Sequence, residues 1–299
     1  MQINTFEELK EYSRKENKKI YEIAQEMECQ NLGISEDKFR QIIKNTLDTM
    51  KEAIKTGLNN TQPTNGKMCG QDCVKLIERY KKNPSIFSKL FEKILTYALA
   101  TSEENARMGK IAACPTAGAC GIVPSILVSL FEELNTDNEK QINSLIVAGL
   151  IGKIISQKVK PAGAIAGCQA ECGTAAAMAA GAAAYLFGYN IDIILNSVSL
   201  CLKNILGLTC DPVRGFVEVP CIKRNPFMAI HAITAVELAS AGIESVIPTD
   251  DVIDAMEQTG ALMSPSLKES SLAGLAKTKT AIIMSKACFT KKYYSELND

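Results

Sequence analysis

The stretch PAGAIAGCQAECGTAAAMAAGAAAYLFG, residues 161–188, carries the clearest signal for the fold. From Gly173 onward it consists almost entirely of alanine, glycine and other apolar residues. A helix with such small side chains packs closely against its neighbours, and a helix that is apolar all round is buried. The glycines and the proline before it predict a loop that leads into this helix. The stretch therefore predicts a buried helix inside a helical protein.

Helical periodicity continues on both sides of this stretch. Apolar residues recur at three-and-four spacing, as on the buried face of an amphipathic helix. Ser35 is a candidate N-cap, and Gly57 marks the end of the same helix. Only VEVPCI, residues 217–222, resembles a strand, and its proline restricts it to a sheet edge. Further helices are predicted over residues 6–27, 35–57, 72–83, 84–109, 117–135, 138–158, 191–207, 225–242 and 250–263.

We therefore predict an all-α fold, organised as a single large helical domain over residues 1–299. Residues 1–108 are more charged and are expected to form one helical layer. Residues 109–275 are expected to form the core that holds the functional site. The hydrophobic content of 46% in a chain of this length is enough for a large core.

Charge and hydropathy exclude several classes of partner. Thirty-three basic residues balance thirty-three acidic ones, so there is no electrostatic reason to expect nucleic acid or a charged membrane as a partner. The first residues are charged and lack the apolar core of a signal peptide. The apolar stretches are too rich in alanine and glycine for a membrane span. We expect a cytoplasmic protein with neither a nucleic-acid nor a membrane partner.

The eleven cysteines are unusual for such a protein. In a reducing cytosol a disulfide framework is not expected, and an odd number fits one poorly. Free cysteine is among the most buried residue types, so most of these thiols are expected to fill core space. If all of them did so, the chain could be a helical assembly subunit with no catalytic activity.

Four loops of small and polar residues are the candidates for chemistry. Small residues let the backbone approach a ligand, and the free N–H groups at a helix N-terminus bind anions. Tight helix packing with glycine at the helix ends would give a similar pattern. The loops are TNGKMCGQDC (64–73), CPTAGACG (114–121), AGCQAECG (166–173) and LTCDPVRGFVEVPC (208–221).

The cysteines in these loops suggest a metal site without identifying it. Cys69 and Cys73, like Cys168 and Cys172, are four positions apart, but zinc sites normally add histidines or a second matching pair. Iron–sulfur clusters take thiolates from separated loops. Cys168, Cys210 and Cys221 lie near glycine or proline, on irregular backbone. Spacing alone does not choose between these sites.

Other catalytic classes have weaker support. His231 is the only histidine, and it lies in the apolar helical run AIHAITA, where a packing role is more common than a catalytic one. Lys67 could form a Schiff base by composition alone. The near-absence of strands counts against the usual pyridoxal folds.

At these loops the chain resembles a known family. CPTAGACGIVPSIL, AGCQAECGTAAAMAAGA and GLTCDPVRGFVEVPCIKRN are similar to signature segments of the iron–sulfur-dependent L-serine dehydratases, specifically the α chain of the two-subunit form. The resemblance spans nearly all 299 residues and is densest from 110 to 275. It implies a [4Fe–4S] cluster held by Cys168, Cys210 and Cys221, and no pyridoxal phosphate.

The resemblance also implies a reaction, the α,β-elimination that turns L-serine into pyruvate and ammonia in amino-acid degradation and gluconeogenesis. Thr116, Ala117 and Gly118 are the expected cradle for the substrate carboxylate, with Asn65 and Gly66 as a second candidate. Lys268 is expected to add positive charge. The base that removes the Cα proton is not identified, and the candidates are Lys67 and His231.

Partners and alternatives follow from the same resemblance. The two-subunit form has a β chain, so a separate β chain, a homo-oligomer or both are expected. A cysteine desulfidase acting on L-cysteine would use the same apparatus, and threonine is a further candidate substrate. The extra thiols are expected to be buried or to tune the cluster or a thiol-bearing substrate; they are Cys69, Cys73, Cys114, Cys120 and Cys172.

Overall fold

The computed structural model describes residues 2–83 and 85–285, and the regular elements of this part are all helical. Its only β-type pairing is an isolated parallel bridge between Cys210 and Lys268. The predicted all-α class is therefore confirmed. The α-helices are α1 (Phe6–Glu16), α2 (Ile20–Leu32), α3 (Glu36–Asn59), α4 (Asp72–Lys82), α5 (Lys89–Ala106), α6 (Ile122–Leu134), α7 (Asn138–Lys158), α8 (Gly163–Ala166), α9 (Cys168–Leu186), α10 (Ile191–Lys203), α11 (Cys221–Ser240) and α12 (Thr249–Leu262). Three short 3-10 helices are η1 (Val213–Gly215), η2 (Pro265–Leu267) and η3 (Gly274–Lys277).

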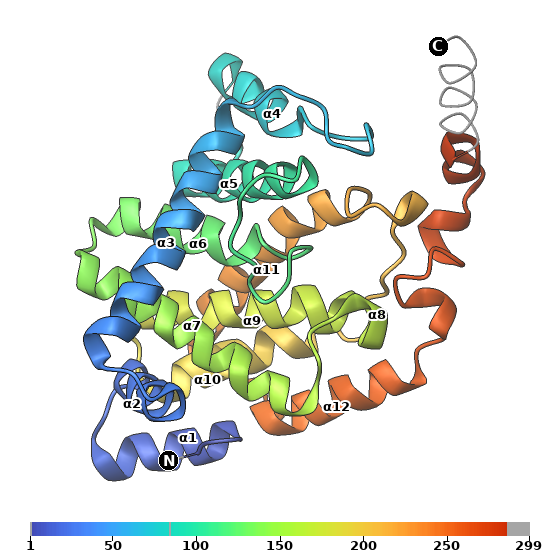
Figure 1. Ribbon diagram of the computed structural model, residues 1–299. Coiled ribbons are helices and arrows are strands. Elements are labelled where there is room, and N and C mark those ends of the chain that lie inside the picture. The colour runs from blue at the N-terminus through green and yellow to red at the C-terminus, as the bar shows by residue number, and fades with distance from the viewer. Residues whose placement is uncertain (1, 84, 286–299) are drawn as a thin grey trace.

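Helix α9 is the centre of the fold (Figure 1). It packs against α6, α7, α10 and α11, and nearly all of its residues are buried. Its small side chains permit this packing: a Cβ atom on Gly173 would lie 2.5 Å from Cδ1 of Ile205. The Ala-rich stretch is thus a helix surrounded by other helices, as the sequence predicts. No helix in the described part of the chain is long and apolar enough to cross a membrane.

Several predicted helix boundaries are wrong. The helix predicted over residues 84–109 is α5, which spans Lys89–Ala106, and the helix predicted over residues 191–207 ends at Lys203. The helix predicted over residues 6–27 is two helices, because Asn17 adopts a left-handed conformation that ends α1. The helix predicted from residue 117 begins at Ile122, after a turn over residues 114–121. The helix predicted from residue 225 begins at Cys221, which puts Pro226 in its second turn rather than its first. In contrast, Ser35 caps α3 as predicted, by accepting a hydrogen bond from the N–H of Lys38.

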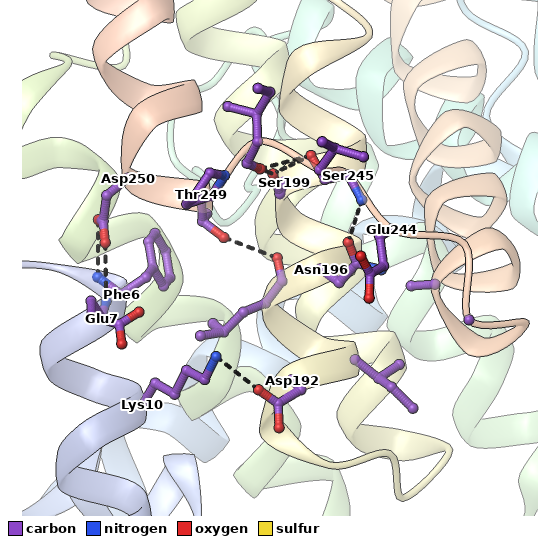
Figure 2. Close-up of a pocket in the computed structure, with 17 residues that line it drawn as sticks. Phe6, Glu7, Lys10, Asp192, Asn196, Ser199, Glu244, Ser245, Thr249 and Asp250 are labelled. Carbon is purple, nitrogen blue, oxygen red and sulfur yellow. Dashed lines mark hydrogen bonds and ion pairs between the residues drawn. The ribbon is translucent and has the colours of Figure 1, made fainter.

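Helix α1 is attached to the rest of the protein beside a surface pocket of about 420 Å³ (Figure 2). The Asp250 carboxylate accepts hydrogen bonds from the N–H groups of Phe6 and Glu7, each at 3.0 Å. Lys10 forms an ion pair with Asp192 of α10, at 3.0 Å. No cysteine lines this pocket, so it is separate from the thiol-bearing loops.

Candidate metal centre

The three predicted cluster ligands come from two helix starts and one loop. Cys168 is the first residue of α9, and Cys221 is the first residue of α11. Cys210 lies between α10 and α11, where the backbone of residues 267–269 holds it. Its N–H donates to Leu267 at 2.8 Å, and its carbonyl accepts from the N–H of Glu269 at 2.6 Å. Two of the three cysteines therefore begin helices rather than lying on irregular backbone.

The thiols of Cys168 and Cys210 lie together with the carboxylate of Glu171. One ligand atom from each of these residues lies within 4.8 Å of the other two. The Cys221 thiol is buried and close enough for the negative charges of Cys168 and Glu171 to affect its ionisation. Burial, followed by the charge of Cys168, raises the pKa of Cys221 to about 12. The fold thus groups two of the three cysteines that the sequence analysis selected, Cys168 and Cys210, and places Cys221 within electrostatic range of them.

Electrostatics favour one thiolate at the centre of this group. Hydrogen bonds from the Cys172 and Cys210 thiols, assisted by the Arg224 guanidinium, hold the pKa of Cys168 well below its ordinary value. The same contacts raise the pKa of Cys172 and Cys210. Metal binding would release the protons of those cysteines that become ligands, because thiols bind metals as thiolates.

Arg224 anchors the site through a buried ion pair. Its Nη1 donates to the Cys168 sulfur at 3.2 Å and to the Thr209 carbonyl at 2.8 Å. Its Nη2 donates to Asp211 at 2.9 Å, and the other Asp211 oxygen accepts from the N–H of Leu275 at 2.8 Å. Arg224, which lies on the Cys221 segment, therefore joins it to the segments of Cys168 and Cys210, and Asp211 extends the connection to the chain that follows α12.

Glu171 is a site residue that the sequence analysis missed. Its carboxylate lies 3.7 Å from the Cys168 sulfur and accepts a short hydrogen bond from the Thr116 hydroxyl. Burial, followed by the negative charge of Cys168, raises the pKa of Glu171 to about 7, although the Thr116 bond opposes the shift. The available signal was a charged residue in the otherwise small-residue loop AGCQAECG.

The turn over residues 114–121 faces Glu171 as well. A Cβ atom on Gly118 would lie 2.6 Å from Oε1 of Glu171. Asn225 holds the turn: its Oδ1 accepts from Gly121 N–H and its Nδ2 donates to the Gly118 carbonyl, both at 2.9 Å. Within the described residues, nothing accepts a hydrogen bond from the N–H groups of Ala117 and Gly118. Thr116, Ala117 and Gly118 thus lie at the site with two donors available.

The surroundings of the other predicted site residues differ. Asn65 and Lys67 are exposed, and the N–H of Gly66 between them donates to the Glu218 carboxylate. Lys268 lies beside Cys210 through the backbone bridge. His231 is not brought to the site. It is ten residues along α11 from Cys221, roughly 15 Å at the rise of an α-helix, and its Nε2 contacts the Cys201 carbonyl at 2.7 Å.

The extra cysteines have different surroundings. Cys73, Cys114 and Cys120 are buried, and burial raises the pKa of each thiol to about 12, so they resemble core-filling residues. Cys172 is buried against Cys168. Cys69 lies beside Lys223, whose Nζ is 2.7 Å from its sulfur. Cys288 lies outside the described residues.

The donor set fits an iron–sulfur cluster better than a hard cation. Thiolate sulfur is the ligand for iron–sulfur clusters, whereas magnesium and calcium take oxygen ligands. The structure leaves little room for a side chain beside the thiols, because a Cβ atom on Gly163 would lie 2.6 Å from the Cys210 sulfur. The cysteine-rich group therefore fits the cofactor that the sequence resemblance implies.

Comparison with known proteins agrees with this geometry. A sequence model of the family described as "Serine dehydratase alpha chain" matches residues 15–276. The chain is 42% identical over 267 residues to the "Probable L-serine dehydratase, alpha chain" of Bacillus subtilis, covering 89% of this chain and 88% of that protein. The chain belongs to the serine dehydratase alpha chain family.

Two further relatives of this α chain differ in length. The "L-serine dehydratase, alpha chain" of Peptoniphilus asaccharolyticus is 37% identical over 278 residues, covering 93% of this chain and 95% of that protein. The "L-serine dehydratase" of Helicobacter pylori strain 26695 is 44% identical over 195 residues, covering 63% of this chain but only 42% of that longer protein. The family resemblance in the sequence is confirmed.

Proposed function

We propose that this chain is the α chain of an iron–sulfur L-serine dehydratase, which converts L-serine to pyruvate and ammonia. The observation that carries the proposal is the group formed by the Cys168 and Cys210 thiols and the Glu171 carboxylate. The buried Cys221 thiol is close enough for the charges of Cys168 and Glu171 to act on it. It occurs in a chain whose relatives are named L-serine dehydratase alpha chains. The reaction is a lyase reaction: serine loses water, and the resulting enamine tautomerises to an imine that water hydrolyses.

Cys168, Cys210 and Cys221 are the proposed ligands of a [4Fe–4S] cluster, which replaces pyridoxal phosphate in this reaction. When bound through three thiolates, such a cluster supplies a Lewis acid that assists departure of the serine hydroxyl. The contact between Arg224 and the Cys168 sulfur supports this assignment, because hydrogen bonds to cluster sulfurs stabilise their negative charge and tune the cluster.

The turn of Thr116, Ala117 and Gly118 is the proposed cradle for the substrate carboxylate. Free backbone N–H groups bind carboxylates, and two are available here beside the thiols. Holding the carboxylate there also stabilises negative charge that develops as the Cα proton leaves. Lys268, whose backbone pairs with that of Cys210, is proposed to add positive charge.

Glu171 is the proposed acceptor for the Cα proton. Its carboxylate lies between the Thr116 hydroxyl and the Cys168 sulfur, so it faces both the proposed carboxylate cradle and the proposed cluster. A base must lie within hydrogen-bond reach of the proton it removes. The exposed residues Lys67 and Asn65 are proposed to contact substrate from the 60–71 segment, where the buried Gly66 donates to Glu218 instead.

A separate β chain is the proposed partner. The relatives that match this chain over about nine-tenths of its length are named alpha chains, and the Helicobacter pylori relative is a longer chain of which the match covers 42%. The remaining part of that protein would correspond to a second subunit here. A cytoplasmic location is proposed because the thiols need a reducing compartment.

An anaerobic assay of the chain with its β chain tests the function. Pyruvate should form from L-serine, and Glu171→Gln should lower kcat by about 100-fold or more with iron content unchanged. Sulfide released from L-cysteine, with no pyruvate from L-serine, would favour the desulfidase. Preferential formation of 2-oxobutanoate from L-threonine would contradict the serine assignment.

A further inference from the structure

Glu218 is a buried carboxylate that the proposed reaction does not use. It precedes Cys221 by three residues, and it is 2% exposed. Its Oε1 accepts from the N–H of Gly66 at 2.5 Å, and its Oε2 accepts from the N–H of Met68 at 3.0 Å. A buried carboxylate is costly unless hydrogen bonds satisfy it, so these two bonds fix the side chain.

The segment that receives Glu218 is shaped for a carboxylate. This segment, residues 60–71, connects α3 to α4 and is called here the 60–71 loop. Lys67 has a φ of 59°, so the flanking N–H groups of Gly66 and Met68 both reach Glu218. A Cβ atom on residue 66 would lie 2.5 Å from Oε1 of Glu218, so a larger residue here would displace the carboxylate from its present position. Successive N–H groups around a left-handed residue form an anion-binding nest.

Two more side chains hold the same loop from the segment around Cys221. Arg214 Nη1 donates to the Gly66 carbonyl at 3.2 Å. Lys223 Nζ lies 2.7 Å from the Cys69 sulfur and 2.5 Å from the Asp72 carboxylate, where α4 begins. Within the described residues, no backbone-to-backbone hydrogen bond joins the 60–71 loop to residues 210–224. Side-chain contacts therefore connect the 60–71 loop to residues 210–224, and Glu218 makes two of these contacts.

We propose that Glu218 is a positioning residue that couples the Cys210–Cys221 ligand segment to the 60–71 loop. Ordering the ligand segment around the cluster orders Glu218, which in turn fixes the loop that presents Asn65 and Lys67. Iron-free protein would then lack both the cluster and an ordered substrate loop. This inference rests on the proposed function, because it assumes that Cys210 and Cys221 hold the cluster.

Hydrogen–deuterium exchange of the full-length protein tests the coupling without an activity assay. In Glu218→Gln, one carboxylate oxygen becomes an amide NH2 that cannot accept a bond from an N–H. Exchange in the peptide that covers residues 60–71 should rise about tenfold at unchanged iron content, since a charge-assisted hydrogen bond is lost. Glu133→Gln, a change at an exposed glutamate on α6, should leave this peptide unchanged. Equal exchange in Glu218→Gln and the unaltered protein would overturn the proposal.

Two further comparisons separate this proposal from the proposed function. Removing iron from the unaltered protein with a chelator should raise exchange in the same peptide, and no change would refute the coupling. A protein that binds no iron, yet exchanges faster in Glu218→Gln, would refute the iron–sulfur function and support the role of Glu218 in holding the loop.

In Glu218→Gln, the KM for L-serine should rise more than kcat falls, because the loop binds substrate. If Glu218→Gln does not fold, Glu218→Asp should show the same increase, because its shorter side chain cannot reach both N–H groups.

Discussion

The guanidinium of Arg224 donates a hydrogen bond to the sulfur of Cys168 across 3.2 Å, and so joins the first turn of α11 to the first residue of α9. This contact places a fixed positive charge beside the thiol whose pKa is lowest in the group. Asp211 holds the guanidinium in place at 2.9 Å. The metal centre is therefore supported by an ion pair that connects all three ligand-bearing segments.

Loss of any one proposed ligand should abolish the cluster. Cys168→Ala, Cys210→Ala and Cys221→Ala should each lose most of the bound iron and the L-serine dehydratase activity, because the cluster needs all three thiolates. Iron analysis and pyruvate formation under anaerobic conditions measure both effects. Cys29→Ala should retain iron and activity, since Cys29 lies on α2 away from the site. Normal iron content in Cys210→Ala would refute the ligand assignment.

Removing Asp211 should destabilise the protein strongly. Asp211→Ala leaves the Arg224 charge without its partner, and both side chains are largely buried. Breaking a buried ion pair in this way costs about 3–5 kcal/mol. Urea unfolding of iron-free protein gives the free energy directly. Asp254→Ala removes one partner of the more exposed pair with Lys158 and should cost less than about 1 kcal/mol. Equal losses in the two variants would contradict this account of Asp211.

The attachment of α1 depends on Asp250 (Figure 2). Asp250→Ala removes the acceptor for the N–H groups of Phe6 and Glu7, and should lower the free energy of unfolding by about 1–3 kcal/mol. Thermal unfolding measures the change. Asp251→Ala is the matched control, because this neighbouring aspartate is exposed, and it should change stability by less than about 0.5 kcal/mol. A stable Asp250→Ala protein would show that packing and the ion pairs of α1 with Asp192 hold the helix without Asp250.

Replacing each of two helical glycines with alanine should change the free energy of unfolding in opposite directions. In α3, a Cβ atom on Gly57 would collide with the backbone carbonyl of Ala100 in α5, so Gly57→Ala should destabilise by about 1–3 kcal/mol. In α7, Gly149 is exposed and has no atom within 4 Å of its Cβ position. Gly149→Ala should stabilise by up to about 1 kcal/mol through helix propensity. Denaturant titration distinguishes the two, and a neutral Gly57→Ala would contradict the close packing of α3 on α5.

The sequence predicted the fold where a local signal existed. Residues 138–158 form a helix with the predicted bounds, because their apolar pattern is strong and Asp137 caps the start. The break at Asn17 was missed, because asparagine within a charged helical pattern is compatible with both continuation and termination. The early start of α11 was missed, because Pro226 suggested a first turn that lies one turn further on.

The site was predictable only in part. The three cysteines came from family resemblance, because three thiols separated by 42 and 11 positions carry no spacing rule of their own. Glu171 and Arg224 owe their roles to contacts between different helices, which a single sequence does not reveal. The same holds for Glu218, whose partners are about 150 positions earlier in the chain.

The most direct test of the central claim is iron and sulfide analysis of protein purified without oxygen, together with its visible spectrum before and after L-serine is added. The account predicts about four iron and four sulfide per chain, a broad visible absorption, and a spectral change with L-serine. A colourless protein that stays free of iron after anaerobic reconstitution would contradict it. The thiols of Cys168, Cys210 and Cys221 would then have a structural role alone.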